Sequence, residues 1–534
     1  MGNIDTNKSA RPDVLIVGAG PTGLMMACQL ARLGVNFRII EKNRESTTQS
    51  RALAIHAGSM EIFSQMGIAD DFINLGKKVK AVNYLVKGNV EKRIALSEFG
   101  KGLTQFPFLL ILEQSKTERL LIAFLEKQGH SVEWQTEIID FKQDNDVVQT
   151  TLLHLGSQEN VKTNWLVGAD GARSQVRQTL DIPFGGQTYP IDLFALDCKV
   201  NWKLKEDEMY IAFSDHSFAG FFPMSEERCR VIGFVPKEAE SKDNISFEDI
   251  NIGFAERMQM NVELYDPSWI STYHSHHRYV SQFKIGRCFL TGDAAHIHSP
   301  VGAQGMNTGL QDAFNLAWKL AFTSQKKSKE ILLSTYEEER LPFARRLVKS
   351  TDRAFNVTVR QNPIVKYIRM KVAPHLLGVI LKIKFFERFI FRNISQIGIT
   401  YQSRICRDPW HKAFSTSSPK PGERLPYIEF ENIDGRKVNI QQRISGLSFH
   451  LFLLSGPSDN NSSEILHLLK RYNDSITFEI IQLVDNTQPI YESFGIKNVG
   501  LYLIRPDYYI AYRSNNLDTK PLEEYLSLFL NHNN

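Results

Sequence analysis

The stretch from Asp13 to Asn43, DVLIVGAGPTGLMMACQLARLGVNFRIIEKN, constrains the fold of this chain more than any other. Val14–Val17 is a continuous apolar run, as expected for a strand that is buried on both faces. Gly18, Gly20 and Gly23 then form G-x-G-x-x-G. The first glycine permits a tight turn, the second lets a pyrophosphate approach the backbone, and the third lets the next helix pack closely. The pattern predicts a doubly wound α/β domain that binds a dinucleotide.

A helix and a second strand complete this unit. Thr22–Leu33 has a helical pattern, Gly34 stops it, and NFRII follows as a strand. Glu41 ends that strand about twenty residues beyond the glycines, where a carboxylate can accept hydrogen bonds from an adenosine ribose. A nicotinamide dehydrogenase and a flavoprotein share this pattern, so it does not identify the cofactor. Three neighbouring residues are included in the predicted cofactor site: Pro21, Thr22 and Lys42.

Two later segments repeat the strand-and-turn pattern. NWLVGADGARSQVRQTL has a turn at Asp170 and Gly171, and GRCFLTGDAAHIHSP has a strand at Arg287–Leu290 that ends in Gly292-Asp293. Ligands collect at the carboxyl edge of a parallel sheet, so both acids are candidates for ligand contact.

Asp293, His296 and His298 raise a second interpretation, because D-x-x-H-x-H offers a carboxylate and two imidazoles to a metal. Upstream, STYHSHHRYV adds three histidines. Strand alternation places His274 and His276 on one face and His277 on the other. No second acid and no C-x-x-C pair supports a metal site, and we expect none. A mixed exposed strand face is the interpretation that we favour for the upstream histidines.

The motifs together resemble the class A flavoprotein aromatic hydroxylases, of the p-hydroxybenzoate and phenol hydroxylase type. The resemblance rests on the glycine loop, GADGARSQVR, and GDAAH followed by P-x-G-x-x-G-M-N-x-G-x-x-D. SRALAIHAGSMEIF and EQSKTERLL match two lesser motifs, and the five segments occur in the family's order between residues 13 and 345. The family implies FAD as cofactor and NAD(P)H as co-substrate.

The resemblance also assigns roles residue by residue. Asp293 matches the acid that binds the FAD ribityl hydroxyls, which answers the metal question in favour of flavin. Pro300 matches a proline beside the flavin near the substrate, and Arg51 matches an arginine near the pyrophosphate and the path of NAD(P)H. These two are the predicted catalytic residues. Gln114 and Asp170 match cofactor contacts. The loop before the next helix would face the flavin pyrimidine, and it contributes Gly302, Gly305, Met306 and Asn307.

Two histidines of the third motif receive different interpretations. We interpret His296 as a local hydrogen-bonding residue, whereas His298 is not fixed by the motif and either lines the flavin pocket or points to solvent.

Residues 186–280 change character, and we expect an antiparallel substrate-binding sheet that the segment 81–101 joins. Strand alternation makes Phe213, Phe218, Phe222 and Met224 candidates for the pocket wall. His216 is a candidate polar contact. An ordinary aromatic sheet core is an equally good account of these side chains.

The C-terminal third falls into two parts. From Arg360 to Arg392 the chain is basic and apolar, which fits either an amphipathic membrane-surface segment or, as we prefer, a packed helix pair with a solvated basic face. We expect Pro374 and Gly378 to break this segment into two helices. Residues 413–534 resemble the thioredoxin-like domain of the longer phenol hydroxylases. The domain lacks redox cysteines, because the last cysteine of the chain, Cys406, precedes it. Its role should therefore be structural or interfacial.

Bulk properties exclude several other classes. The net charge of +4 over 534 residues gives no reason to expect nucleic acid. Five cysteines without a C-x-x-C pair fit a reducing cytoplasm. We find neither a signal sequence nor an apolar run of the roughly twenty residues that span a bilayer. The sequence leaves homodimerisation open.

We therefore expect an FAD-dependent monooxygenase that uses NAD(P)H and O2 to hydroxylate a phenolic or polycyclic aromatic substrate. The family implies a flavin C4a-hydroperoxide. Epoxidation or another oxygenation of a polyketide stays open, and so does a non-catalytic FAD-binding protein that recruits a partner. The predicted division has FAD-binding parts at 11–185 and 281–358, a substrate sheet at 186–280, a helical connector at 359–412 and a thioredoxin-like domain at 413–534.

Overall fold

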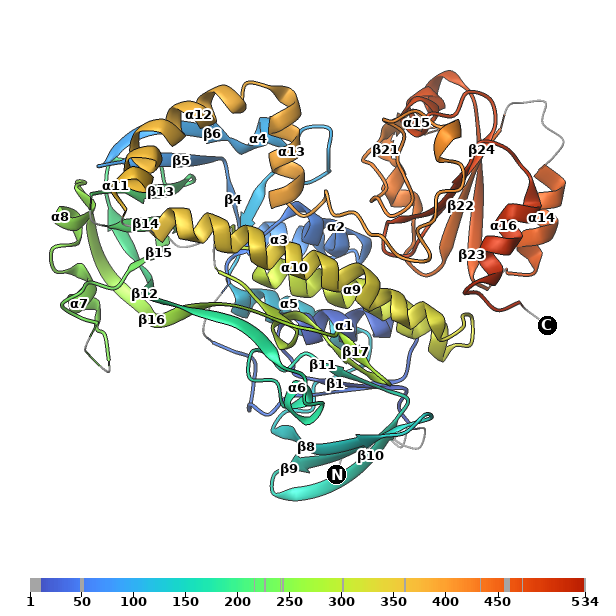
Figure 1. Ribbon diagram of the computed structural model, residues 1–534, viewed down its shortest axis with the longest axis horizontal. Helices are drawn as coiled ribbons and strands as arrows, with labels where there is room; N and C mark the ends of the chain where they lie inside the picture. Colours follow the sequence, from blue (N-terminus) through green and yellow to red (C-terminus); the bar gives the residue numbers. More distant parts are fainter. Residues whose placement is uncertain are drawn as a thin grey trace.

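The structure is a computed structural model that describes residues 11–48, 52–215, 217–224, 227–240, 242, 244–299, 302–359, 362–432, 434–455, 462–472 and 474–532. Arg51, His216 and Pro300 lie outside the described residues. Figure 1 shows a central region that carries β1 and α1, a large curved sheet at its left, and a C-terminal body at its right.

The central sheet has five strands in the order β17-β18-β11-β1-β2, and every pair is parallel except β17 with β18. Strands that are far apart in the sequence thus share one sheet, as the three motifs predict. The strands are β1 Val14–Val17, β2 Phe37–Ile40, β11 Trp165–Gly168, β17 Lys284–Ile285 and β18 Cys288–Leu290. The main helices beside them are α1 Pro21–Arg32, α5 Gln114–Lys127, α6 Gln175–Thr179 and α9 Gly305–Ser324.

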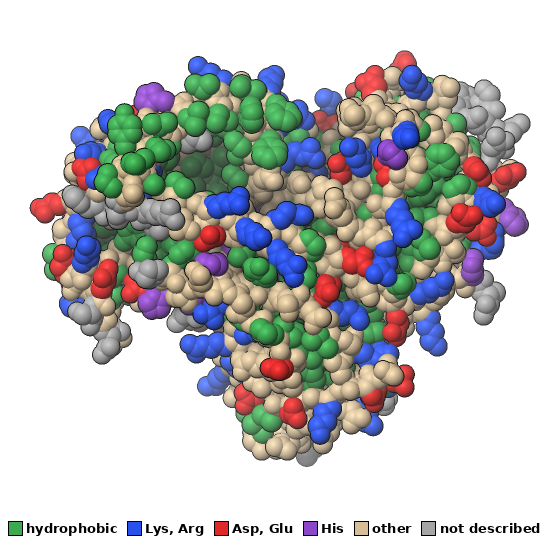
Figure 2. Space-filling view, viewed as in Figure 1, with side chains coloured by type: hydrophobic (Ala, Val, Ile, Leu, Met, Phe, Trp, Pro, Cys, Tyr) green, Lys and Arg blue, Asp and Glu red, His purple; other side chains and the backbone are tan. Residues whose placement is uncertain are grey.

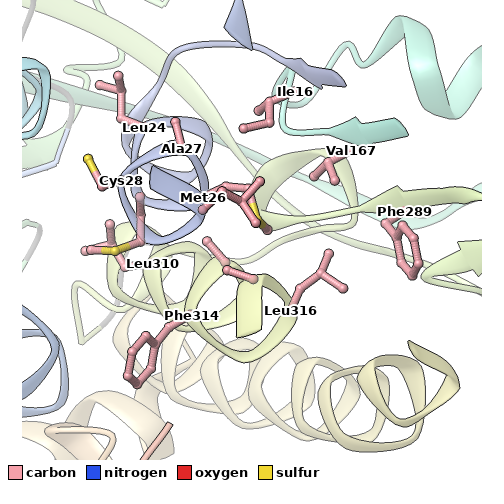
Figure 3. Close-up of a cluster of buried hydrophobic side chains, with 14 of the residues drawn as sticks. Ile16, Leu24, Met26, Ala27, Cys28, Val167, Phe289, Leu310, Phe314 and Leu316 are labelled. Carbon is pink, nitrogen blue, oxygen red and sulfur yellow. The ribbon is translucent and has the colours of Figure 1, made fainter. Parts of the chain in front are cut away.

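The core of this region forms where α1 and α9 pack together. Figure 3 shows side chains of β1, β11 and β18 beside those of the two helices, among them Ile16, Val167, Phe289, Leu24 and Leu310. All five are fully buried, which explains why these segments are apolar without alternation.

Smaller elements surround the central sheet. Between β2 and β11 the chain forms two three-stranded sheets, β3-β7-β4 and the antiparallel β10-β9-β8. Their strands are β3 Ala54–Ile55, β4 Lys77–Val79, β7 Leu109–Ile111, β8 Thr136–Gln143, β9 Val148–His154 and β10 Ser157–Thr163. The helices are α2 Ala57–Gln65, α3 Ala69–Leu75 and α4 Leu96–Phe99. The long α10, Ile331–Val359, packs beside α9 and contains Pro342.

The second large sheet has eight strands in the order β19-β16-β12-β15-β14-β13-β5-β6. The segment 81–101 joins it as expected, but β5 pairs with β13 in parallel, so the sheet is not wholly antiparallel. The reason is connectivity, because β5 arrives from the flavin-binding part and not through a hairpin from β13. The strands are β5 Ala81–Val86, β6 Asn89–Ala95, β12 Phe184–Asn201, β13 Met209–Phe213, β14 Phe218–Pro223, β15 Arg228–Phe234, β16 Glu263–Val280 and β19 His296–Ile297. One face packs on α7 Phe247–Asn251 and α8 Phe254–Met258.

The helical connector differs from the prediction. Pro374 and Gly378 do not break it, because both lie inside α12. A π-helical turn, η2, precedes Pro374, and such a turn shifts the hydrogen-bonding pattern so that a proline is tolerated. The break falls instead between Ile380 and Lys384. The elements are α11 Pro363–Tyr367, η2 Ile368–Val372, α12 Ala373–Ile380 and α13 Lys384–Ile394.

The C-terminal body has a four-stranded sheet in the order β23-β22-β24-β25, with β22 and β23 parallel and the other pairs antiparallel. Its elements are β20 Glu429–Glu431, β21 Lys437–Asn439, β22 Phe449–Ser455, α14 Ser462–Lys470, β23 Ile476–Gln482, α15 Gln488–Phe494, β24 Gly500–Ile504, β25 Ile510–Ser514 and α16 Thr519–Ser527. Trp318 and Phe322 of α9 pack edge-on against Phe449 of β22, so the two bodies share one apolar cluster. Among the described residues, no helix is both long and apolar enough to cross a bilayer.

Candidate flavin and substrate site

The glycine loop between β1 and α1 is shaped by three different constraints. Gly18 has φ of +101°, and a Cβ on it would lie 2.5 Å from the Ala169 carbonyl oxygen. A Cβ on Gly23 would lie 1.9 Å from the Gly18 oxygen, so only glycine lets α1 start so close to β1. A Cβ on Gly20 would meet nothing within 4 Å. The protein therefore does not require glycine at position 20, whereas a ligand that approaches this backbone would.

Glu41 closes the other side of this loop. Its Oε2 accepts a hydrogen bond from the Ala19 amide at 2.9 Å, and its Oε1 accepts two from Asn43. The neighbouring Lys42 is exposed, and Pro21 is the first residue of α1. The carboxylate thus lies beside the glycine loop, as the sequence predicts.

Thr22 connects the first and third motifs. Its Oγ1 lies 2.6 Å from a Cβ built on Gly292 and 2.2 Å from one built on Gly309. Both glycines therefore let α1 approach the turn before Asp293 and the first turns of α9.

Asp170 engages the start of α6. Ser174 donates its hydroxyl to Asp170 Oδ1 at 2.5 Å, and the Val176 amide donates to Oδ2 at 3.1 Å. Burial raises the pKa of Asp170 although these hydrogen bonds oppose the shift. Its backbone lies against Gly18, so it shapes the glycine loop from the β11 side.

Asp293 projects from a turn that is otherwise buried. The turn is η1, Gly292–Ala294, and both of its end residues are buried while Asp293 is exposed. Behind it, Asp312 of α9 accepts a hydrogen bond from the Gly292 amide at 3.1 Å and contacts His296 Nε2 at 2.7 Å. The carboxylate that His296 contacts is therefore Asp312, in keeping with the local hydrogen-bonding role predicted for this histidine.

Arg340 of α10 completes this support, since its Nε donates to Asp312 Oδ1 at 2.5 Å. Burial opposes ionisation, but the Arg340 guanidinium and the contact with His296 hold the pKa of Asp312 below its usual range. Within the described part of the chain, no group of three or more His, Cys, Asp or Glu side chains is placed to hold a metal ion.

The start of α9 contains the predicted Asn307, which is held by two residues that the sequence analysis missed, His56 and Ser59. Asn307 is fully buried, and its Oδ1 accepts hydrogen bonds from the His56 amide at 2.9 Å and the Ser59 hydroxyl at 2.8 Å. His56 Nε2 lies 2.9 Å from the Gly302 carbonyl oxygen. Burial lowers the pKa of His56. The polar residues inside the apolar AIHAGSMEIF segment were the available signal.

The remaining loop residues lie at the start of α9. The helix begins at Gly305, two residues before Asn307, and Met306 packs on the central core. Gln114 reaches the segment after residue 51, because its Oε1 accepts the Ala52 amide at 3.2 Å.

His298 is now placed. Its Nδ1 lies 2.9 Å from the Ser299 carbonyl oxygen, and a Cβ on Gly305 would lie 3.9 Å from its Nε2. That Nε2 atom is shielded from solvent and has no hydrogen-bond partner among the described residues. Burial lowers the pKa of His298 to about 4. The ring is therefore neutral near pH 7. With Nδ1–H donating to Ser299, Nε2 keeps a lone pair, at the start of α9, that no described residue uses.

The four predicted pocket residues that the structure describes share one face of the eight-stranded sheet. Phe222 and Met224 pack in a cluster with Leu53 and Ala303, so this part of the face reaches the loop before α9. Phe213 and Phe218 oppose each other on β13 and β14, with ring centroids 5.4 Å apart.

A buried ion pair lies on the same face and was missed from the sequence. Arg230 stands opposite Phe222 in the β14–β15 register and donates two hydrogen bonds of 2.6 Å to Asp197 of β12. The guanidinium also lies 4.5 Å from the ring centroid of Trp269. Charged residues at inward positions of LFALDCKV and RCRVIGF were the signal.

The three upstream histidines line the β12–β16 pairing. His274 is exposed and contacts Asp192 at 2.5 Å, while His276 contacts the Thr188 hydroxyl at 2.8 Å. His277 packs against the Tyr189 ring. These contacts tie together two long strands.

Comparison with known proteins agrees with this arrangement. Residues 11–351 match the FAD binding domain family. The chain is 30% identical to 6-methylpretetramide 4-monooxygenase of Streptomyces rimosus over 96% of this chain and 92% of that protein. It is 33% identical to pentachlorophenol 4-monooxygenase of Sphingobium chlorophenolicum over 64% of each chain. The flavin-dependent monooxygenase PieE, solved with FAD and substrate, superposes with a TM-score of 0.81, 21% identity and coverage of 97% and 99%.

The fold and the site define a flavoprotein in which the loop before α9, next to the dinucleotide-binding sheet, packs in one cluster with an aromatic face of the second sheet. The chain belongs to the FAD binding domain family and, within it, to the class A FAD-dependent aromatic hydroxylases. It is an FAD-dependent aromatic monooxygenase, and its co-reactants are a small molecule and O2.

Proposed function

We propose that this enzyme hydroxylates a phenolic or polycyclic aromatic compound with electrons from NAD(P)H. The observation that carries the proposal is one apolar cluster that contains Met224 and that both Phe222 and Ala303 pack against, so the aromatic sheet face and the loop before α9 meet there. A flat ring can stack on such a face, which keeps water away from the reacting position. The pentachlorophenol and 6-methylpretetramide relatives carry phenolic and polycyclic names, which supports this substrate class.

The residues present fit FAD. The open side of Gly20 and the carboxylate of Glu41 suit a pyrophosphate and a ribose, and the exposed Asp293 suits vicinal hydroxyls. FAD, when bound, supplies the redox chemistry that activates O2. We assign cofactor contact to the remaining predicted residues as well: Gly18, Pro21, Thr22, Gly23, Lys42, Arg51, Gln114, Asp170, Pro300, Gly302, Gly305, Met306 and Asn307. Arg51 and Pro300 keep their predicted catalytic role as a proposal.

The product test is a screen of phenols and polycyclic aromatics for stimulated NAD(P)H oxidation, with the product mass measured under labelled O2. The proposal expects one oxygen atom from O2 on an aromatic carbon. Label from water in the product would contradict monooxygenation, and an epoxide would favour the alternative oxygenation.

Substrate should control the use of the reductant. The sequence has no second G-x-G-x-x-G to hold NAD(P)H in a fold of its own, and we propose that the reductant binds transiently beside the substrate. We expect a turned-over aromatic to speed flavin reduction about tenfold or more, a barrier change of about 1.4 kcal/mol. Stopped-flow absorbance with NADPH or NADH measures this. Equal rates with and without the substrate would contradict the gating.

His298 should act as a hydrogen-bond acceptor for the substrate hydroxyl. His298→Phe keeps a ring but removes the Nε2 lone pair. We expect kcat/KM to fall about tenfold, because the buried substrate hydroxyl would lose its hydrogen-bond acceptor. Because burial lowers the pKa of His298 to about 4, the wild-type profile should show no ionisation of this residue in the neutral range. His411→Phe, at an exposed histidine, is the control. Weaker FAD binding with unchanged kcat/KM would show instead that His298 accepts a hydrogen bond from the cofactor.

We further propose that the C-terminal body is a thioredoxin-like unit without redox work. Its strand order and its cysteine-free sequence from residue 413 support this assignment. All five cysteines of the chain are free thiols, which supports a reducing, cytoplasmic location.

A further inference from the structure

The helical connector lies on the outer edge of the eight-stranded sheet. Residues Pro363–Ile380 form one continuous helical run through α11, η2 and α12, and α13 follows after a short turn. The Tyr84 hydroxyl donates to the Arg369 carbonyl at 2.7 Å, and the Phe391 ring packs against Gly100 and Phe99. These contacts fix which side of the helices faces the protein.

The opposite side of the first helical run is apolar. Five large side chains of this run recur at spacings of three or four residues, which places them on one helix face. They are Ile364, Ile368, Val372, Leu376 and Val379, and each exposes between 41% and 70% of its surface. Ile383, which is 48% exposed, follows them in the turn before α13. The buried Met370 and Pro374 lie on the other face of the same run. The apolar stripe therefore points outward.

Helix α13 repeats this arrangement. Phe385 and Phe389 are 72% and 58% exposed and lie away from the buried Phe391. Exposed basic residues at intervals of four flank them: Lys384, Arg388 and Arg392. Lys371 and Lys382 add two exposed charges beside the first stripe. Between residues 363 and 394 the sequence contains one acid, Glu387.

The two helices together expose more apolar surface than is usual for a protein surface in contact with water. Figure 2 shows hydrophobic side chains gathered over α12 and α13, with Lys and Arg side chains around them and a hollow beside them. Contiguous apolar patches of this kind mark interaction sites. The solvated basic face that we preferred from the sequence is therefore only the rim of an apolar surface.

We propose that this α12–α13 surface, formed by the exposed side chains of residues 364–394, docks on an anionic lipid bilayer. An amphipathic helix of this composition lies in the plane of the interface, with its apolar stripe among the acyl chains and its Lys and Arg residues at the phosphates. Charge favours lipid over a second copy of the chain. A twofold contact would bring the same basic rim against itself, with one acid from each copy to compensate.

The test uses full-length protein loaded with FAD and sedimentation with phosphatidylcholine vesicles that do or do not contain phosphatidylglycerol. We expect binding to the anionic vesicles that weakens with added salt. Phe385→Gln with Phe389→Gln preserves the charge and should lower the partition coefficient about tenfold or more. Lys384→Gln with Arg388→Gln should weaken binding to anionic vesicles alone.

The matched control is Ile252→Gln with Phe478→Gln, at side chains of similar exposure on other surfaces, 73% and 46%. It should bind as the wild type does. Absence of vesicle binding by the wild type, or equal binding by the Phe385/Phe389 variant, would overturn the proposal. So would a dimer in light scattering that the same variant dissociates, because a second copy would then cover the surface. Turnover plays no part in these readings, so they are independent of the proposed reaction.

Discussion

Asp293→Ala should purify as a folded protein that has lost most of its FAD. The carboxylate is exposed at the end of β18, on a turn whose flanking residues are buried. A carboxylate that accepts from two vicinal hydroxyls makes charge-assisted hydrogen bonds, and losing two of them should weaken binding about hundredfold. The turn itself should persist, because Asp312, His296 and Arg340 hold it from behind and are not changed.

Fluorescence titration of the apoprotein with FAD measures the affinity, and circular dichroism checks the fold. Asp140→Ala, at an exposed acid on β8, should leave both unchanged. Asp293→Asn keeps one acceptor oxygen and should fall between the wild type and Asp293→Ala. A variant that keeps its flavin but loses a bound metal would show that D-x-x-H-x-H is a metal site after all.

The parts of the site that could be predicted from the sequence are those built from local backbone chemistry. Gly18 and Gly23 can be read from the motif because a turn and a close helix start leave no room for a Cβ, and the structure places both as expected. The position of Glu41 can be predicted because the acid that ends the second strand lies about twenty residues beyond the glycine motif. Strand alternation likewise placed Phe222 and Met224 on the face that reaches the loop before α9.

What was missed depends on pairs of residues far apart in the chain. The hydrogen bonds of Asn307 to His56 and Ser59 span about 250 positions, and nothing local at either end specifies the partner. The Arg230–Asp197 pair depends on strand register, which a single sequence does not reveal. Pro374 shows the converse, since local preference predicted a break that a neighbouring π turn removed.

The junction between the two bodies is the largest such omission. The sequence predicts a structural or interfacial role for the C-terminal body, but not that its segment Arg505–Asp507 carries a buried ionic network. Arg505 donates to both oxygens of Glu339 in α10, at 2.6 and 3.0 Å, and also to Asp507. Lys319 of α9 reaches the same Glu339 at 2.8 Å. Burial opposes the charge, yet Arg505 and Lys319 hold the pKa of Glu339 below its usual range.

Arg505→Ala should therefore cost about 3–5 kcal/mol of unfolding free energy, because it leaves buried carboxylates with part of their positive charge removed. Arg471→Ala is the matched control in the same body. Its partner Glu523 and Arg471 itself are 38% and 45% exposed, and such pairs contribute about 0–1 kcal/mol. Urea unfolding followed by circular dichroism gives both values, and equal midpoints for the two variants would contradict the assignment.

The same titration tests whether the bodies fold together. Phe449 packs on Trp318 and Phe322 of α9. The same helix begins at Gly305, in the loop that we assign to the flavin site, so α9 connects that site to the C-terminal body. If Arg505→Ala lowers one shared transition, and FAD release follows that transition, the C-terminal body is part of the flavin fold. Separate transitions, with FAD kept through the first, would show instead that α9 is stable without its partner. The ionic network would then join two units that fold independently.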